Sequence, residues 1–231
     1  MKEGVPMLIP RYYFSNEYTE LYDYFLSKPH RKRTFQRGEY LWKPAELIHK
    51  VYYIISGISV TYAEHEEGRR KILFFHTTGS IFPGFHESTF KIERSIITRA
   101  ISDMETLEFS REEVYRMFQE NRRMSNITFE SYAREINLLI YETAHQDYNN
   151  SFLKLCNLLY LFSKDSPDGN PNHIDLTQDN IADILTINRV NAAKCISRLR
   201  DEGIIISHRK WIEITDPEAL EHYCSQETLL S

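Results

Sequence analysis

The hydrophobic pattern of this chain changes its period once, near residue 110, and this change constrains the fold more than any other feature. Between about Thr34 and Phe109, short runs rich in β-branched and aromatic residues alternate with turn signals, which is typical of strands at close spacing. From Glu112 onward, apolar residues recur at intervals of three or four, which predicts amphipathic helices. The sequence therefore predicts an α+β chain in which a small barrel or sandwich precedes a helical region.

The strands of the first region are predicted from runs of apolar residues bounded by glycine or turn formers. These runs are residues 51–55, 58–62, 71–75, 96–101 and 106–109. Gly57 separates the first two runs, and the pair Glu67 and Gly68 is a turn signal before the third.

A helix of roughly 25 residues is predicted to begin near Asn121. One apolar face carries Phe129, Ala133, Ile136, Ile140 and Ala144. Other apolar residues, at 127, 138, 139 and 141, lie on other sides of the same helix. A helix that is apolar on more than one side must pack against its own domain and against a further surface, and a second copy of the chain is the simplest one. A further apolar helix is predicted over residues 151–162.

The segment 181–205 has the spacing of a helix-turn-helix. Thr177 and Asn188 are predicted to cap its two helices, and Gly203 is placed to end the second one. The apolar residues expected between the helices are Ile181, Leu185, Ile187, Ala192, Ile196 and Leu199. Residues 204–206 and 211–214 flank a basic turn and predict a β-hairpin. The alternative is an ordinary pair of helices without a nucleic-acid role.

The second helix of this pair presents its polar N-terminal side outward, and that part of a recognition helix enters the major groove. Arg209 and Lys210, in the hairpin turn, are placed to meet phosphates. The residues expected to contact DNA are Thr177, Gln178, Asn188, Arg189, Val190, Asn191, Lys194, Arg209 and Lys210.

Charge and composition exclude several other classes of protein. The net charge of −5 argues against a protein that coats nucleic acid, although residues 189–210 hold six Lys or Arg against two acids. No apolar stretch approaches the ~18 residues of a membrane span, so no membrane partner is expected. The cysteines, at 156, 195 and 224, form no disulfide framework or zinc motif, and a cytoplasmic location is expected. No nucleophile–base pair, paired carboxylates or phosphate-cradling loop is visible, so we expect neither an enzyme nor a metal or other cofactor.

Several blocks of the chain resemble the Crp/Fnr transcription regulators. Residues 37–46, 53–60, 79–82 and 93–100 are similar to successive parts of the effector-binding β-roll of that family, and residues 176–183 to the start of its winged helix-turn-helix. The resemblance implies a cyclic-nucleotide-binding-like jelly roll over residues 1–110, a connecting and dimerisation helix over 111–148, and a DNA-binding domain over 149–231. It also implies a homodimer, a pseudo-palindromic operator, a small-molecule effector, and RNA polymerase as a candidate partner.

Departures from the family pattern bear on the effector. Cyclic-nucleotide binders of the family hold the ribose with a Gly-Glu pair and the phosphate with Arg-Ser. Arg94 and Ser95 match the second pair, but gap-free counting places Pro83 and Gly84 at the first, so cyclic AMP is not expected. Arg94 then has two alternatives, a ligand contact or a structural ion pair.

Other cofactors of the family are also not expected. The clustered N-terminal cysteines of its iron–sulfur members are missing, and His76 and His86 are expected to be solvated or hydrogen-bonded histidines rather than haem ligands.

Aromatic residues suggest a different effector class. The head of the chain, residues 8–10 followed by aromatics, is similar to the halorespiration regulators, which bind chlorinated phenolic acids. The residues expected to contact an aromatic or anionic effector are Phe74, Phe85, Arg94, Ser95, Tyr132 and Arg134. The alternative is that the aromatic side chains are filled core.

Three functions remain open on the sequence. The favoured one is a DNA-binding transcription regulator that an effector switches. A second is a constitutive DNA-binding protein with an empty roll, and a third is a sensor or enzyme that keeps only the roll. In the favoured case, the usual recognition triad of the family, Arg, Glu and Arg, falls on Arg189, Val190 and Lys194, which predicts an unusual operator.

Overall fold

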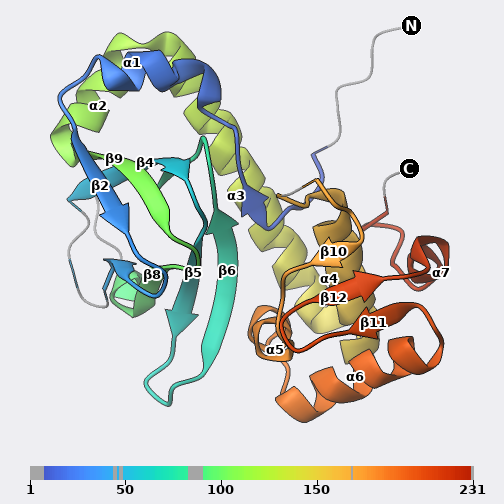
Figure 1. Cartoon of the computed structure of the whole chain (residues 1–231). Helices are drawn as coiled ribbons and strands as arrows, with labels where there is room; N and C mark the ends of the chain where they lie inside the picture. Colours follow the sequence, from blue (N-terminus) through green and yellow to red (C-terminus); the bar gives the residue numbers. More distant parts are fainter. Residues whose placement is uncertain (1–7, 44–45, 47–48, 83–90, 168, 230–231) are drawn as a thin grey trace, which may run out of the picture. The chain divides into compact units, whose positions relative to one another are not determined.

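The computed structural model describes residues 8–43, 46, 49–82, 91–167 and 169–229, and these form two compact units (Figure 1). One unit is Tyr13–Ser131, and the other comprises Met1–Tyr12 and Tyr132–Ser231. Helix α3 (Arg122–Tyr148) runs from the first unit into the second. The predicted candidates Pro83, Gly84, Phe85 and His86 lie outside the described residues.

The first unit consists of two β-sheets and a set of helices. In chain order its elements before α3 are β1 (Tyr13–Phe14), η1 (Thr19–Leu21), α1 (Tyr22–Leu26), β2 (Arg31–Phe35), β3 (Tyr40–Trp42), β4 (Lys50–Ser56), β5 (Ser59–Glu64), β6 (Arg70–His76), β7 (Ile81–Phe82), η2 (Lys91–Ser95), β8 (Ile96–Ala100), β9 (Met104–Ser110) and α2 (Arg111–Glu120).

The strands pair into a five-stranded sheet, in the order β1-β6-β5-β8-β3, and a four-stranded sheet, in the order β2-β9-β4-β7. Among the described strands of these two sheets, β1 and β6 pair in parallel and the other neighbours are antiparallel. The predicted strands correspond to β4, β5, β6, β8 and β9 and are confirmed with small shifts at their ends. The strands β1, β3 and β7 were missed because two or three residues show no period, and β2 because four of its five residues are polar and exposed.

Alternation along β4 explains how the two sheets form a roll. Val51 and Tyr53 pack with Leu107 of β9 and with the helices α1, α2 and α3. The alternating side chains of β4, Tyr52 and Ile54, belong to a second cluster. This cluster joins β2, β4 and β9 to β3 and β8 of the other sheet. Because successive strand residues point to opposite faces, the second cluster marks the interior of the roll.

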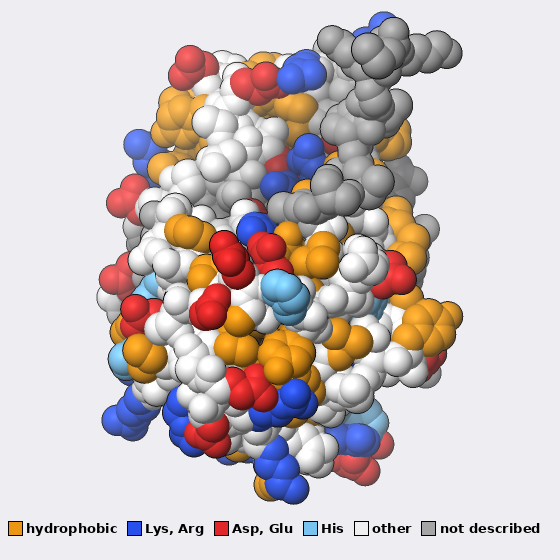
Figure 2. All heavy atoms as spheres, turned by 90° about the vertical axis from the view of Figure 1, so that its right-hand side faces the viewer, with side chains coloured by type: hydrophobic (Ala, Val, Ile, Leu, Met, Phe, Trp, Pro, Cys, Tyr) orange, Lys and Arg blue, Asp and Glu red, His pale blue; other side chains and the backbone are white. Residues whose placement is uncertain are grey.

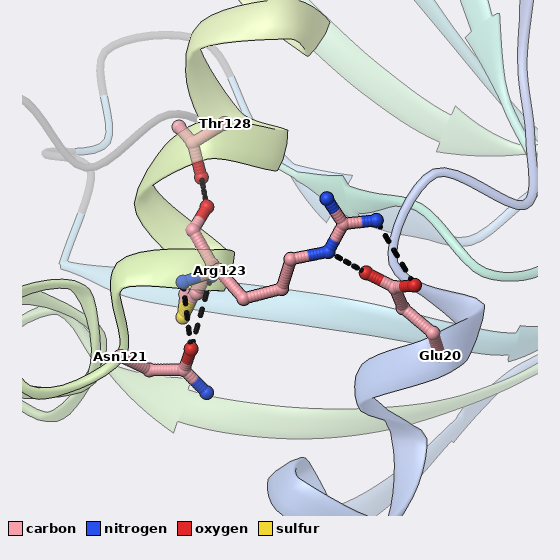
Figure 3. A network of polar contacts seen from close by, with 5 residues as sticks. Glu20, Asn121, Arg123 and Thr128 are labelled. Carbon is pink, nitrogen blue, oxygen red and sulfur yellow. Dashed lines mark hydrogen bonds and ion pairs between the residues drawn. The ribbon is translucent and has the colours of Figure 1, made fainter.

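The start of α3 is held to the first unit by polar contacts (Figure 3). The Asn121 side chain accepts hydrogen bonds from the backbone N–H of Arg123 and of Met124, at 3.0 and 3.2 Å. The Arg123 guanidinium forms an ion pair with Glu20 of η1, and Thr128 Oγ1 donates to the Met124 carbonyl at 2.8 Å. The predicted helix start near Asn121 is therefore confirmed, with Asn121 satisfying N–H groups that the helix leaves open.

The second unit is mainly helical. After α3 its elements are α4 (Ser151–Lys164), β10 (His173–Ile174), α5 (Gln178–Leu185), α6 (Arg189–Asp201), β11 (Ile205–Ser207), β12 (Ile212–Ile214) and α7 (Pro217–His222). Strands β10, β12 and β11 form a small antiparallel sheet. The predicted helix over 151–162 and the predicted hairpin are confirmed, although β12 starts at Ile212 rather than at Trp211.

Candidate nucleic-acid interface

The helices α5 and α6 form the predicted helix-turn-helix, and both predicted caps are present. The Thr177 hydroxyl accepts from the backbone N–H of Asn180 at 3.1 Å, and the Asn180 side chain accepts from the backbone N–H of Thr177, which is a reciprocal capping box. The Asn188 side chain accepts from the backbone N–H of Asn191 at 2.8 Å. Between the caps, Thr186 ends α5 with φ +53°.

Apolar contacts hold the two helices together as expected. The buried members of the predicted set are Ile181, Leu185, Ala192, Ile196 and Leu199. Ile187 is a correction, because it is only half-buried. It lies in the turn between the helices, where one side of the chain faces solvent.

The outward side of α6 holds the side chains predicted to meet bases. Arg189, Val190 and Lys194 are exposed, and Val190 is 63% exposed although it is apolar. Asn191 is half-buried, and Gln178 is exposed at the start of α5. The contact of Val190 with a thymine methyl group stays a prediction.

Two basic residues in the C-terminal half of α6 form ion pairs with neighbouring acids. Arg198 forms an ion pair with Glu202 at 2.9 Å, and its guanidinium lies over the Phe152 ring at 3.8 Å; the hydrogen bond from Arg198 lowers the pKa of Glu202. Arg200 pairs with Asp201. Figure 2 shows Lys and Arg side chains along its lower edge, with acidic side chains among them. Arg189 and Lys194, nearer the N-terminus of α6, are exposed and remain the predicted DNA contacts on this helix.

Arg189 has a partner that the sequence did not suggest. Its Nε lies 2.9 Å from Oδ1 of Asp179, in the first turn of α5. Both side chains are mostly exposed, at 77% and 56%. No periodicity in the sequence relates residues ten positions apart on two helices, so the contact follows from the crossing of the helices alone.

The β11–β12 hairpin presents Arg209 and Lys210 at its exposed turn. The turn is closed by a backbone hydrogen bond from the His208 N–H to the Trp211 carbonyl at 2.9 Å. The Trp211 ring stacks on His208 at 3.7 Å and lies 4.5 Å from His173 of β10. This ring stack, which the sequence analysis missed, restricts the turn that holds the two cations.

The interior of the roll contains polar atoms without hydrogen-bond partners. Ser59 and His76 are opposite each other on β5 and β6, and Ser59 is also opposite Ala100 of the interior cluster. Ser59 Oγ and His76 Nδ1 are buried, and the described structure gives neither atom a partner. Burial lowers the pKa of His76 to about 3, which keeps the ring neutral. The expectation of a solvated His76 is wrong, because the ring is buried and the phenyl rings of Phe14, Phe74 and Phe82 lie 4.7 to 5.7 Å from it between ring centroids.

The predicted effector residues fall in different surroundings. Phe74 is half-buried in the roll, Ser95 is half-buried and Arg94 is exposed at the end of η2. Tyr132 and Arg134 are half-buried on α3 in the second unit, and Phe85 lies outside the described residues.

A cavity of about 530 Å³ opens elsewhere in the roll. Its lining includes Phe35, Trp42 and Tyr52, together with Arg33, Lys50 and other charged side chains. Of the predicted effector residues that the structure describes, none lines this cavity.

Comparison with known proteins accounts for both units. The cyclic nucleotide-binding domain model matches residues 32–121, and the Crp-like helix-turn-helix domain model matches residues 153–223. Together these two matches cover more than half of the chain, in the order that the family has them. The chain belongs to the Crp/Fnr family. The predicted α+β architecture of β-roll, long helix and winged helix-turn-helix is thereby confirmed.

Relatives of this Crp/Fnr chain are distant. The global nitrogen regulator of Synechococcus elongatus is 22% identical over 199 residues, which cover 83% of this chain and 88% of that protein. The structure of FixK2 from Bradyrhizobium japonicum matches with a TM-score of 0.72 at 16% identity, over 85% of this chain and 98% of that chain. CprK in complex with OCPA matches with a TM-score of 0.70 at 18% identity, over 94% and 97%. Similarity at these identities shows the shared fold, and nearness to the halorespiration group stays a prediction.

The Crp/Fnr assignment makes the chain a transcription regulator with a Crp-like helix-turn-helix domain. The roles of individual residues in DNA binding stay predictions. Among the described helices, none combines the length and the apolar character that a membrane span needs.

Proposed function

We propose that an effector other than cyclic AMP switches this Crp/Fnr regulator, and that the effector is an aromatic or anionic small molecule bound in the roll. The observation that supports the proposal is that polar atoms without partners lie among aromatic rings inside the roll. Ser59 and the neutral His76 supply unpaired polar atoms among phenyl rings, and such a surface suits a ligand with an aromatic body and a polar substituent.

The sequence at the ribose position supports the same proposal. Pro83 and Gly84 offer no carboxylate to a ribose hydroxyl, and losing a hydrogen-bond acceptor in a buried site removes most of the discrimination for that ligand. Arg94 keeps a cation for a carboxylate or phenolate.

Calorimetry with cyclic AMP tests the exclusion directly. We expect no binding at micromolar concentration, because the ribose hydroxyls find no acceptor. A dissociation constant of one micromolar or better, about −8 kcal/mol, would contradict the proposal. Aromatic carboxylates and phenols are the next ligands to titrate, with Arg94→Ala as the matched variant that should weaken them.

The alternative functions differ in how a ligand changes the affinity for operator DNA. A constitutive family member with an empty roll binds its operator equally with and without ligand, whereas the proposed regulator changes affinity when the effector shifts the population of its two states. A sensor or enzyme that keeps only the roll would have no need for the exposed Arg189 and Val190 on a capped helix pair.

The same proposal includes a dimer that reads a pseudo-palindromic operator through α6, with half-sites about one helical turn (~34 Å) apart. Arg189 donates hydrogen bonds to a guanine or a phosphate, and Val190 contacts a thymine methyl group. Lys194 acts as a point charge, because lysine lacks the bidentate donors of arginine. We therefore expect an operator shifted toward A·T at the base pair that Val190 faces.

Replacing Val190 with Glu tests this docking. Glu accepts a hydrogen bond from the cytosine amino group, so selection from random duplexes should move toward C·G at that position by about 1–3 kcal/mol per base pair. Arg209→Ala is the control, since a lost phosphate contact weakens all sequences alike and flattens the salt slope by about one unit. An unchanged selected operator for Val190→Glu would mean that α6 does not dock in this way.

A further inference from the structure

The ion pair between α5 and α6 involves the side chain best placed to read a base. Arg189 is the first residue of α6 and Asp179 the second residue of α5. They meet through Nε and Oδ1 at 2.9 Å, with both side chains mostly in solvent. An exposed ion pair of this kind contributes little to the free energy of unfolding. A stabilising effect therefore does not explain why the pair lies at this position.

The atom used in the contact leaves the reading edge of the arginine available. A guanidinium is a rigid plane with five N–H donors, and a carboxylate on Nε occupies only one of them. The two terminal nitrogens lie at a fixed angle to that contact, and a pair of arginine N–H donors is what binds O6 and N7 of guanine in the major groove. Holding Nε therefore also aims the opposite end of the plane.

The charge of Asp179 adds a second consequence. A carboxylate at the start of α5 complements the helix dipole, but it also repels the DNA phosphates and so weakens sequence-independent binding. An acid there lowers non-specific affinity while orienting the base-reading cation, and both effects raise the ratio of specific to non-specific binding.

We infer that Asp179 is a positioning residue that orients Arg189 for a guanine and thereby sets operator specificity. The inference rests on the proposed docking of α6. Arg189 remains the group that touches the base, and Asp179 acts through it.

The test compares base preference, measured by selection from random duplexes, for the full-length wild type and matched variants. In Asp179→Ala, preference at the base pair assigned by Arg189→Ala should fall about fivefold or more, while affinity for random DNA stays the same or rises. Asp179→Glu should restore part of the preference, because the longer acid can still reach Nε. Asp201→Ala is the control: it removes the same charge from an exposed acid that pairs with Arg200, and the preference should not change.

A double variant separates orientation from charge. Once Arg189 is alanine, adding Asp179→Ala should leave the base preference as it is, since no guanidinium remains to be aimed. An additional loss in the double variant would overturn the inference.

The outcomes also separate this inference from the docking itself. If Arg189→Ala shifts the preference and Asp179→Ala, with an unchanged melting profile, does not, only the positioning role is wrong. If Asp179→Ala lowers stability and leaves the preference intact, Asp179 is a helix-terminal charge and the inference is wrong. If Arg189→Ala changes no base preference, the docking and this inference both fail.

Discussion

His76 is a titratable side chain buried among aromatic rings of the roll. Its ring lies in van der Waals range of phenyl groups, with centroids 4.7 Å from Phe82 and 5.1 Å from Phe74. Burial lowers its pKa from 6.5 to about 3, so the folded chain holds the neutral ring where the unfolded chain binds a proton. Between those two values, unfolding takes up a proton and is favoured by acid.

The residue-scale prediction concerns stability against pH. The free energy of unfolding should fall by about 1.4 kcal/mol per pH unit below pH 6.5 on account of His76, because the unfolded state binds more protons there. His76→Phe removes this contribution, so its stability relative to the wild type should improve by about 2 kcal/mol between pH 7 and pH 5. Urea unfolding at the two pH values measures the change.

Phe74→Leu provides the control for this measurement. It alters the packing around the same ring without a titrating group, so its cost should be equal at both pH values. A constant difference between His76→Phe and the wild type would show that the pKa of His76 is the same in the folded and the unfolded chain.

At the scale of elements, the α5–α6 pair depends on one backbone conformation. Thr186 ends α5 in the left-handed region, with φ +53° and ψ +42°, where a β-branched side chain is strained and glycine is not. The strain is tolerated because the caps on both sides and the buried apolar contacts fix the turn. The conformation of this turn also determines where Asp179 and Arg189 meet.

Replacing Thr186 with Gly should therefore stabilise the second unit. We expect a gain of about 1 kcal/mol, the strain removed less the extra freedom of glycine in the unfolded chain, measured as a shift of the urea midpoint with an unchanged slope. Thr143→Gly, at an exposed site inside α3, is the matched control and should cost a few tenths of a kcal/mol. Equal effects at both sites would contradict the strain argument.

At the scale of the whole molecule, α3 presents the predicted apolar face to solvent. Within the single chain Phe129, Ile136 and Ile140 are exposed, the last two at 55% and 64%, whereas Met124 and Leu138 on the other sides of the helix are buried. An exposed apolar stripe along a long helix is typical of an interface. We propose that a second copy covers it, as the homodimer of the family would.

Charged residues on this face test the dimer. Ile136→Glu with Ile140→Glu should give monomers in sedimentation, because each buried isoleucine contributes about 1.5–3 kcal/mol per copy. Operator binding should be lost with the dimer, since one half-site keeps only part of the contacts. Gln119→Glu adds a charge to an exposed site on α2 and should leave the dimer intact. A monomeric wild type would refute the proposal.

Local spacing along the chain was enough to predict several features of the fold. The change of period near residue 110, the caps Thr177 and Asn188 and the stop at Gly203 each rest on residues a few positions apart, and backbone geometry reads such patterns directly. The helix-turn-helix and the exposed side of α6 followed from the same rules.

Contacts between residues that lie far apart in the sequence, or on different elements, became visible once the chain was folded. The parallel pairing of Tyr13 and Phe14 with β6, the burial of His76 among Phe14, Phe74 and Phe82, and the approach of Asp179 to Arg189 leave no periodic trace in the sequence. These contacts arise when packed sheets and crossing helices bring side chains together, and the free energy of that packing is shared across the whole core rather than encoded in any one segment.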